Sequence, residues 1–163
     1  IGYTLYKGMR KVPGVNLDKP FVANYDRRHV ANIQAAYDFN DRWTFGATFT
    51  FSTGRPITLP TGKFEYQNYH PDVITERNGY RLPTFHRLDL SATYSPRKNA
   101  NRRLKGQWVF SIYNAYNQQN PFTVYTRITQ DDDGEVIGDG HTKEARMIYL
   151  FPILPSVTYN FKF

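Results

Sequence analysis

The chain lacks several features that would each have pointed to a particular class of protein. It contains no cysteine, which excludes a disulfide framework and any thiolate metal site. It contains no run of about 18 apolar residues, which excludes a transmembrane helix within this sequence. No Gly-x-Ser-x-Gly, His-Glu-x-x-His or phosphate-binding motif occurs. We therefore expect no enzymatic activity, no cofactor and no catalytic residue.

Aromatic residues, in contrast, are abundant. They make up 17% of the 163 residues, with 13 Tyr and 12 Phe. Such a fraction is typical of the aromatic girdles of outer-membrane barrels, and also of a soluble all-β protein with a Tyr-rich binding surface. Composition alone leaves both alternatives open.

The net charge of +7 usually indicates an anionic partner such as nucleic acid. The basic residues lie mainly between the expected strands, however, and no nucleic-acid-binding motif is present. We expect solvated loops and no nucleic-acid partner. The basic residues concerned are Lys7, Arg10, Lys11, Lys19, Arg97, Lys98, Arg102, Arg103 and Lys105.

Alternation of apolar and polar residues predicts β-strands, and no segment has helical periodicity. The clearest case is 42–53, where large apolar residues alternate with Thr, Ser and Gly. The last ten residues, LPSVTYNFKF, alternate in the same way after Pro155. Asn40 and Asp41 are expected to form a tight turn. The six expected β segments are 1–7, 27–39, 42–53, 84–95, 105–117 with a continuation at 122–129, and 143–163.

The expected connections between these segments sort by length. Residues 8–26, 54–83 and 130–142 form long connections, and the 54–83 stretch is expected to lack regular structure. Residues 40–41 and 96–104 form shorter ones. Because adjacent antiparallel strands leave a sheet at opposite ends, the long connections should gather at one end, as they do in outer-membrane barrels.

Each expected strand has an aromatic face and a face of small hydroxylic residues. We predict an all-β, antiparallel transmembrane β-barrel. An exposed apolar terminal strand would tend to pair with other chains, and this hazard disappears when the strand is part of a closed barrel whose apolar face contacts lipid. The alternative is a soluble or surface β-sandwich that binds a partner. Six strands are too few to close a barrel, so further strands must complete it. The residues predicted to face lipid are Trp43, Phe45, Phe49, Phe51, Leu88, Leu90, Phe110, Ile112, Val157, Tyr159 and Phe161.

Four stretches resemble the closing strands of TonB-dependent receptors of the Bacteroidota outer-membrane kind. They are YDRRH at 25–29, NGYRLPTFHRLDLSATYS at 78–95, WVFSIYNAYNQQNPF at 108–122 and the C-terminal PSVTYNFKF. The resemblance implies that residues 1–163 are the last six strands of a plugged barrel of about 22 strands.

The same resemblance implies a location in the cell outer membrane and the import of a bulky solute, such as an iron chelate, a glycan or a peptide. The implied partners are outer-membrane lipid, the rest of the barrel and its plug, TonB, and the barrel-assembly machinery. Tyr159, Phe161 and Phe163 match the terminal signal that this machinery reads.

Several polar and aromatic residues are weaker candidates for a binding role. Tyr66, Tyr69 and Tyr80 in the long 54–83 connection are candidates to stack on a sugar or aromatic chelate, although loop packing is the plainer interpretation. Arg87 and Asp89 lie two residues apart and should form an ion pair in a polar lumen. Arg27 and Arg28 are further candidates for lumen or rim charges.

No metal site is expected. The acidic run from Asp131 to Glu135 departs from the spacing of an EF-hand loop, so we interpret it as a solvated loop and not as a calcium site. The four histidines lack zinc-type spacing. They are His29, His70, His86 and His141.

Overall fold

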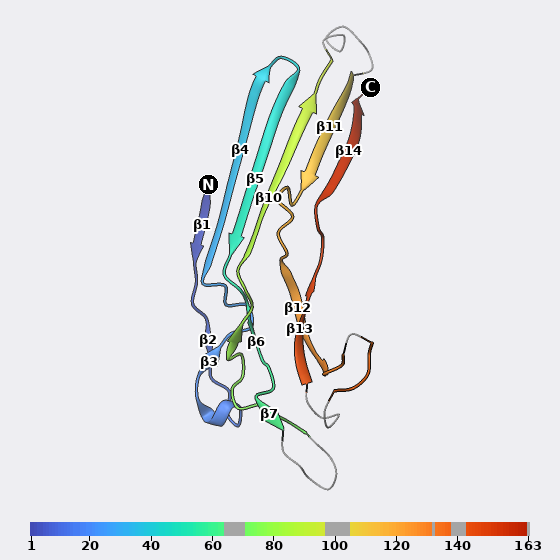
Figure 1. Ribbon diagram of the computed structural model, residues 1–163. Coiled ribbons are helices and arrows are strands. Elements are labelled where there is room, and N and C mark those ends of the chain that lie inside the picture. The colour runs from blue at the N-terminus through green and yellow to red at the C-terminus, as the bar shows by residue number, and fades with distance from the viewer. Residues whose placement is uncertain (64–70, 97–104, 132, 138–142, 163) are drawn as a thin grey trace.

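A computed structural model describes residues 1–63, 71–96, 105–131, 133–137 and 143–162. Its main element is a six-stranded antiparallel sheet in which neighbours in sequence are neighbours in space (Figure 1). The strands are β1 (Gly2–Leu5), β4 (His29–Asn40), β5 (Trp43–Ser52), β10 (Phe85–Tyr94), β11 (Lys105–Tyr113) and β14 (Leu154–Lys162). The prediction of an all-β, antiparallel chain is confirmed.

The strand register aligns the apolar positions of all six strands on one face. Phe49 lies between Ile33 of β4 and Leu88 of β10. Its neighbour Thr48, which points to the opposite face, lies beside Asp89 of β10. Because side chains alternate along a strand, this register gives the whole sheet one apolar face and one polar face.

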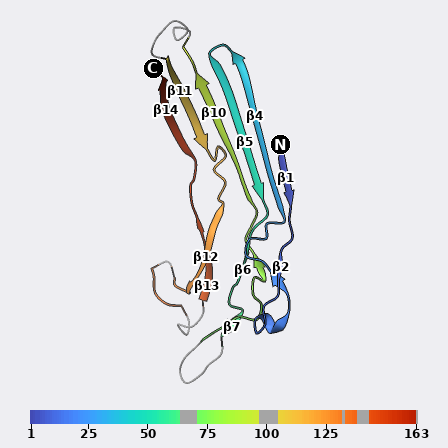
Figure 2. The same cartoon turned by 180° about the vertical axis from the view of Figure 1, so that it is seen from behind.

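The two ends of the sheet differ, as the connection lengths predict. At one end of the sheet, β4 is followed by β5, and β10 ends where β11 begins (Figures 1 and 2). The chain leaves β1, β5 and β11 at the other end, from which the long connections start. The β4–β5 turn is formed by Asp41 and Arg42, one residue later than expected. The side-chain oxygen of Asn40 accepts hydrogen bonds from the backbone N–H groups of Arg42 and Trp43, at 2.9 and 3.0 Å, and so ends β4.

The long connections contain short strand pairs, so the expectation that 54–83 lacks regular structure was wrong. Two-residue strands have too few positions to show alternation, and backbone pairing alone reveals them. The pairs are β2 (Met9–Arg10) with β3 (Phe21–Val22), β6 (Pro56–Ile57) with β9 (Tyr80–Arg81), and β7 (Gly62–Lys63) with β8 (Asp72–Val73). The 3-10 helix η1 (Asn16–Asp18) lies between β2 and β3.

Strands β12 (Pro121–Ile128) and β13 (Lys143–Tyr149) form a separate two-stranded sheet beyond the end of the main one (Figure 1). The expectations that 122–129 continues 105–117 and that 143–163 is one segment were therefore wrong. The chain leaves β11 through Asn114 and Asn117, both at φ 55°, and approaches β14 through Phe151 at φ 60°. These left-handed residues turn the backbone away from the strand direction.

Almost no apolar side chain is buried. Among the described residues, the buried hydrophobic side chains are Phe21, Ala23 and Leu82, and none belongs to the six-stranded sheet. The accessible surface is 12179 Å², whereas a compact monomer of 19.1 kDa would expose roughly 8,400 Å². The sheet is thus a single layer without a core of its own. In the described part of the chain, no helix is long and apolar enough to cross a membrane.

Candidate functional site

The apolar face of the sheet carries every residue that we predicted to face lipid. Phe45, Val157 and Phe161 are 44%, 61% and 62% exposed, although they are large and apolar. No described segment forms a second layer over this face (Figures 1 and 2). By their register, the predicted residues that lie on it are Trp43, Phe45, Phe49, Phe51, Leu88, Leu90, Phe110, Ile112, Val157, Tyr159 and Phe161.

A row of four aromatic side chains crosses the apolar face at the short-turn end. Trp43, Tyr94, Trp108 and Tyr159 are consecutive cross-strand partners on β5, β10, β11 and β14. The ring centroids of Trp43 and Tyr94 are 4.8 Å apart, and those of Trp108 and Tyr159 are 4.7 Å apart. Such rings combine an apolar body with a polar N–H or O–H, which suits a boundary between apolar and aqueous surroundings.

At the other end, the apolar face finishes in histidine–tyrosine pairs. The Tyr116 hydroxyl lies 2.8 Å from His86 Nδ1, and the Tyr3 hydroxyl lies 2.7 Å from His29 Nδ1. On β10, the two amphipathic boundaries fall at Tyr94 and His86. At about 3.4 Å per residue and a tilt of about 40°, these positions lie roughly 20 Å apart across the sheet.

The polar face has a transverse row of small side chains. Ala36, Gly46, Ser91, Ser111 and Ser156 are consecutive partners across five strands. The hydroxyls of Ser111 and Ser156 are 2.7 Å apart. A hollow of about 600 Å³ lies over this row, because no long side chain fills it.

The predicted ion pair between Arg87 and Asp89 is confirmed, and it lies on the polar face. Arg87 Nη2 is 2.8 Å from Asp89 Oδ2. The guanidinium carbon also lies 4.0 Å from the centroid of the Tyr113 ring. Asp89 Oδ1 accepts the backbone N–H of Asn114 at 3.0 Å, so the pair also holds the end of β11.

A second cavity, of about 500 Å³, lies where β5 and β11 end, β10 begins and the β12–β13 hairpin starts. Ser52 and Phe85 line it from the sheet, and Phe122 and Phe151 line it from the hairpin side. The hairpin is held in place partly by Arg55, whose Nη2 donates to the Phe122 carbonyl oxygen at 3.1 Å.

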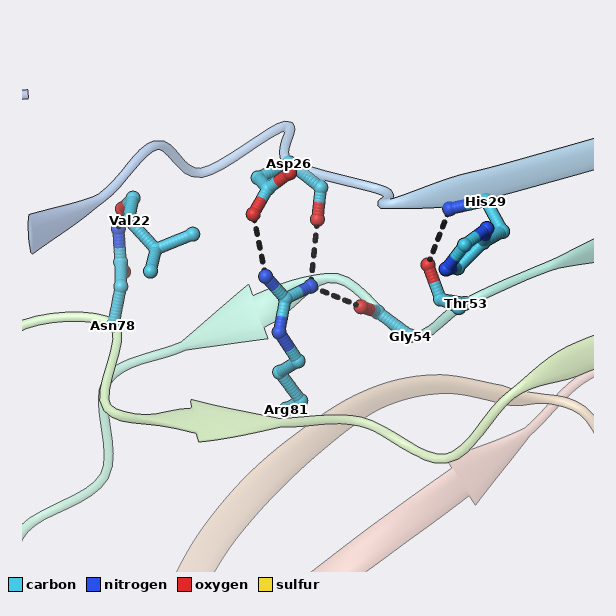
Figure 3. Close-up of polar contacts among 7 residues, drawn as sticks. All are labelled: Val22, Asp26, His29, Thr53, Gly54, Asn78 and Arg81. Carbon is cyan, nitrogen blue, oxygen red and sulfur yellow. Dashed lines mark hydrogen bonds and ion pairs between the residues drawn. The ribbon is translucent and has the colours of Figure 1, made fainter. Parts of the chain in front are cut away.

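Buried polar side chains tie the long connections together beside this cavity. Arg81 pairs with the fully buried carboxylate of Asp26 and donates to the Gly54 carbonyl oxygen at 3.1 Å (Figure 3). Asn78 donates from Nδ2 to the Val22 carbonyl oxygen at 2.7 Å. These bonds satisfy backbone groups that the short strands leave unpaired.

Comparison with known proteins adds nothing to this geometry: no protein-family model matches the chain, and neither a curated protein nor a solved structure matches it significantly.

The remaining candidate residues are only partly within the described structure. Tyr80 is 42% exposed in β9 and does not line the 500 Å³ cavity. The described residues contain no cluster of His, Asp or Glu that could hold a metal ion. Asp131 instead caps its own loop, since its Oδ1 accepts the backbone N–H groups of Asp133 and Glu135 at 3.1 and 2.7 Å. Tyr66, Tyr69, His70, His141 and Phe163 lie outside the described residues.

The sequence did not predict a role for the polar residues beside the 500 Å³ cavity, which we call the junction. They lie nevertheless within the stretches that carry the family resemblance. Asp26 belongs to YDRRH, Asn78 and Arg81 belong to NGYRLP, and Asn114 and Asn120 belong to YNAYNQQN. All except Arg81 are buried. Polar residues inside motif-like stretches, away from any alternating pattern, were the available signal.

Proposed function

We propose that this chain is part of an outer-membrane transport barrel of the TonB-dependent receptor kind, with no enzymatic activity and no resident cofactor. Its location would be the outer membrane of a Gram-negative bacterium similar to the Bacteroidota. The observation that carries the proposal is the apolar face, which is continuous over six strands and has no covering layer among the described residues.

An apolar face of this kind is unfavourable in water. Each fully buried large apolar side chain contributes about 1.5–3 kcal/mol. The residues of this face gain only part of that stabilisation within the chain, since none of them is buried. Exposed apolar patches this extended mark a protein interface or a membrane surface. The amphipathic rows at both ends favour lipid, because a membrane has an aqueous boundary on each side of its apolar layer.

Strand length supports the same proposal. Strands β5 and β10 have 10 residues each, and β11 and β14 have 9 each. Tilted transmembrane strands need about 9–11 residues. The roughly 20 Å between the two amphipathic rows is also close to the height of about 25 Å of the apolar band in outer-membrane barrels.

The open edges of the sheet support a larger assembly. β1 and β14 each have one partner strand in the described sheet, so both present an unpaired edge. In lipid, every unpaired backbone group costs several kcal/mol, and closure with further strands removes that cost. The rest of a receptor barrel, with its plug, would supply this closure.

The polar face suits the interior of such a barrel. Its row of small side chains leaves a hollow of about 600 Å³, and the Arg87–Asp89 pair keeps the surface hydrophilic. An interior of this kind admits water, a plug or a bulky solute. Because four stretches of the chain resemble TonB-dependent receptors, we propose an iron chelate, a glycan or a peptide as the solute.

Depth-dependent quenching of tryptophan fluorescence tests the proposal. The chain contains two tryptophans, Trp43 and Trp108, and both lie in the aromatic row. In bilayers whose lipids carry bromine, both should be quenched, most strongly when bromine lies near the headgroups. A β-sandwich would shield these rings from every brominated lipid, and that result would refute the proposal.

A matched variant controls for general contact with lipid. Val109 follows Trp108 in β11 and points to the polar face. In a chain with Trp43→Phe, Trp108→Phe and Val109→Trp, the new fluorophore should respond to aqueous iodide and not to brominated lipid.

A further inference from the structure

The 500 Å³ cavity at the junction is within the size range of small-molecule sites, about 300–1,000 Å³. We propose that it binds an organic anion with a flat, aromatic body. This inference rests on the proposed function, because it takes the polar face as the one that meets the solute. The inference names the chemical class of the solute, or of the part of the solute that this cavity binds.

The walls supply the apolar contacts. Phe122 and Phe151 line the cavity and are 60% and 58% exposed, so little protein covers their side chains. The rings of Phe151 and Tyr113 meet edge to face, with centroids 6.2 Å apart. With Phe85 on the sheet side, the rings of the hairpin side favour a flat apolar guest that packs between them.

The charge of the walls is entirely positive. Arg27 and Arg55 line the cavity, and no Asp or Glu is among the described residues that line it. Arg55 is fixed at the wall by its bond to the Phe122 carbonyl oxygen. Two nearby acids have arginine partners, Asp26 Oδ2 with Arg81 and Asp89 Oδ2 with Arg87. Asp26 Oδ1 is buried without a partner, but Asp26 is not among the described residues that line the cavity. The two arginines of the wall therefore favour an anion.

A buried hydroxyl at the cavity lacks a partner. Ser52 is 2% exposed, it lines the cavity, and its Oγ makes no hydrogen bond. Buried polar groups of this kind normally have a partner, so the orphan hydroxyl indicates a missing ligand atom or water. A carboxylate oxygen would accept its proton.

The same walls disfavour a neutral sugar. Sugar hydroxyls need acceptors as well as donors, and the amide oxygens of Asn24 and Asn120 each accept one hydrogen bond already. Asn24 Oδ1 accepts from Asn78 at 2.6 Å, and Asn120 Oδ1 accepts the backbone N–H of His86 at 3.0 Å. Arg87 donates to the Tyr113 hydroxyl. The side-chain groups that remain are mainly donors and positive charge, which match an anion.

The test compares 2-naphthoate with 2-naphthamide, which has the same ring system without the charge. Binding is measured by calorimetry on the full chain in lipid nanodiscs, with empty nanodiscs subtracted. Naphthoate should bind saturably and at least about tenfold more tightly than naphthamide. Equal affinity for the two, or tighter binding of maltotriose than of naphthoate, would overturn the inference.

Variants locate the binding. Arg27→Gln should weaken naphthoate binding about tenfold, and Ser52→Ala should weaken it to a smaller extent. Arg42→Gln, an exposed arginine at the opposite end of the sheet, should leave it unchanged. If Arg27→Gln and Ser52→Ala both retain full affinity, the cavity is not the site. The strand content of each variant, read by circular dichroism, verifies that it is folded.

The tryptophan quenching experiment, run on the same nanodiscs, separates the two proposals. Quenching without naphthoate binding would overturn this inference, whereas the proposal of a transport barrel would still hold. Naphthoate binding without quenching would overturn the proposal of a transport barrel, and only the ligand class of the cavity would be supported.

Discussion

The carboxylate of Asp26 is fully buried against the guanidinium of Arg81, although 55 positions separate them in the sequence. Arg81 Nη1 also donates to the backbone carbonyl oxygens of Asp26 and Gly54, at 2.9 and 3.1 Å (Figure 3). One side chain thus joins the segment that enters β4, the segment that leaves β5 and the segment that enters β10. This triple attachment fixes the end of the sheet where the cavity lies.

Removing Arg81 should therefore weaken the junction strongly. In Arg81→Met, Asp26 would keep a buried charge with no partner, since its Oδ1 already lacks one. Breaking a buried pair from one side typically costs about 3–5 kcal/mol. Urea unfolding in detergent, followed by circular dichroism, should show this loss.

A double variant tests the cause. Asp26→Asn with Arg81→Met removes both charges, so it should cost less than the two single changes added together. Strict additivity would mean that the pair is not coupled, in contradiction to the structure.

Gly54 should not tolerate a side chain. A Cβ atom at this position would overlap the Leu82 carbonyl oxygen and lie 2.8 Å from that of Pro83. Both contacts are backbone, so Gly54→Ala must displace the segment that enters β10. We expect a loss of about 3 kcal/mol in the free energy of unfolding, at the upper end of overpacking effects.

Gly62, in the same connection, provides the matched control. Among the described residues, a Cβ there meets nothing within 4 Å, so Gly62→Ala should change stability by less than about 0.5 kcal/mol. Similar losses for both variants would point to a general sensitivity of the connection and away from the close backbone approach at Gly54.

The two faces of β5 should differ in their tolerance of charge. If the apolar face meets lipid, Phe49→Arg places a cation near the middle of the bilayer and should cost about 2–4 kcal/mol. Thr48→Arg, one residue away on the polar face beside Asp89, should cost much less. Unfolding of both variants from bilayers by urea measures the difference, and equal costs would contradict the assignment of faces.

Alternation in the sequence was sufficient to predict the main sheet. In 42–53, the pattern located β5 to within one residue at each end, because a strand with two unlike faces has a period of two. The short turn at Asn40 then indicated its partner, β4. With the partners and the faces known, only registers that differ by an even number of residues remain, since a slip of one residue would exchange the faces.

Alternation could not predict what lies beyond that sheet. It shows which way a side chain points but not which strand its segment pairs with, so β12 and β13 were interpreted as continuations of β11 and β14. The turns that separate them depend on left-handed residues, among them Asn114 and Phe151, which carry no periodic signal. The contact between Asp26 and Arg81 depends on the path of the whole chain, and no local spacing indicates it.

The β12–β13 hairpin should respond to acid through Glu144. Its Oε1 accepts hydrogen bonds from Nε of Arg127 and Nε of Arg146, both at 2.7 Å. These bonds, first from Arg127 and then from Arg146, hold the pKa of Glu144 below its ordinary value. A lowered pKa in the folded hairpin means that the stabilisation is complete above the unfolded pKa of about 4.3.

That stabilisation is lost as the pH falls below about 4.3 and through the lower pKa of the folded hairpin. Protection of the Nε–H protons of Arg127 and Arg146 from exchange with solvent, followed by NMR, should therefore be constant at neutral pH and fall in this acidic window. Glu144→Gln should remove the pH dependence, because the amide does not titrate. Arg146→Gln should keep it, because Arg127 still holds the carboxylate. An acid transition that persists in Glu144→Gln would assign the change to another carboxylate, with Asp72, which pairs with Lys143 of β13 at 2.9 Å, as the next group to substitute.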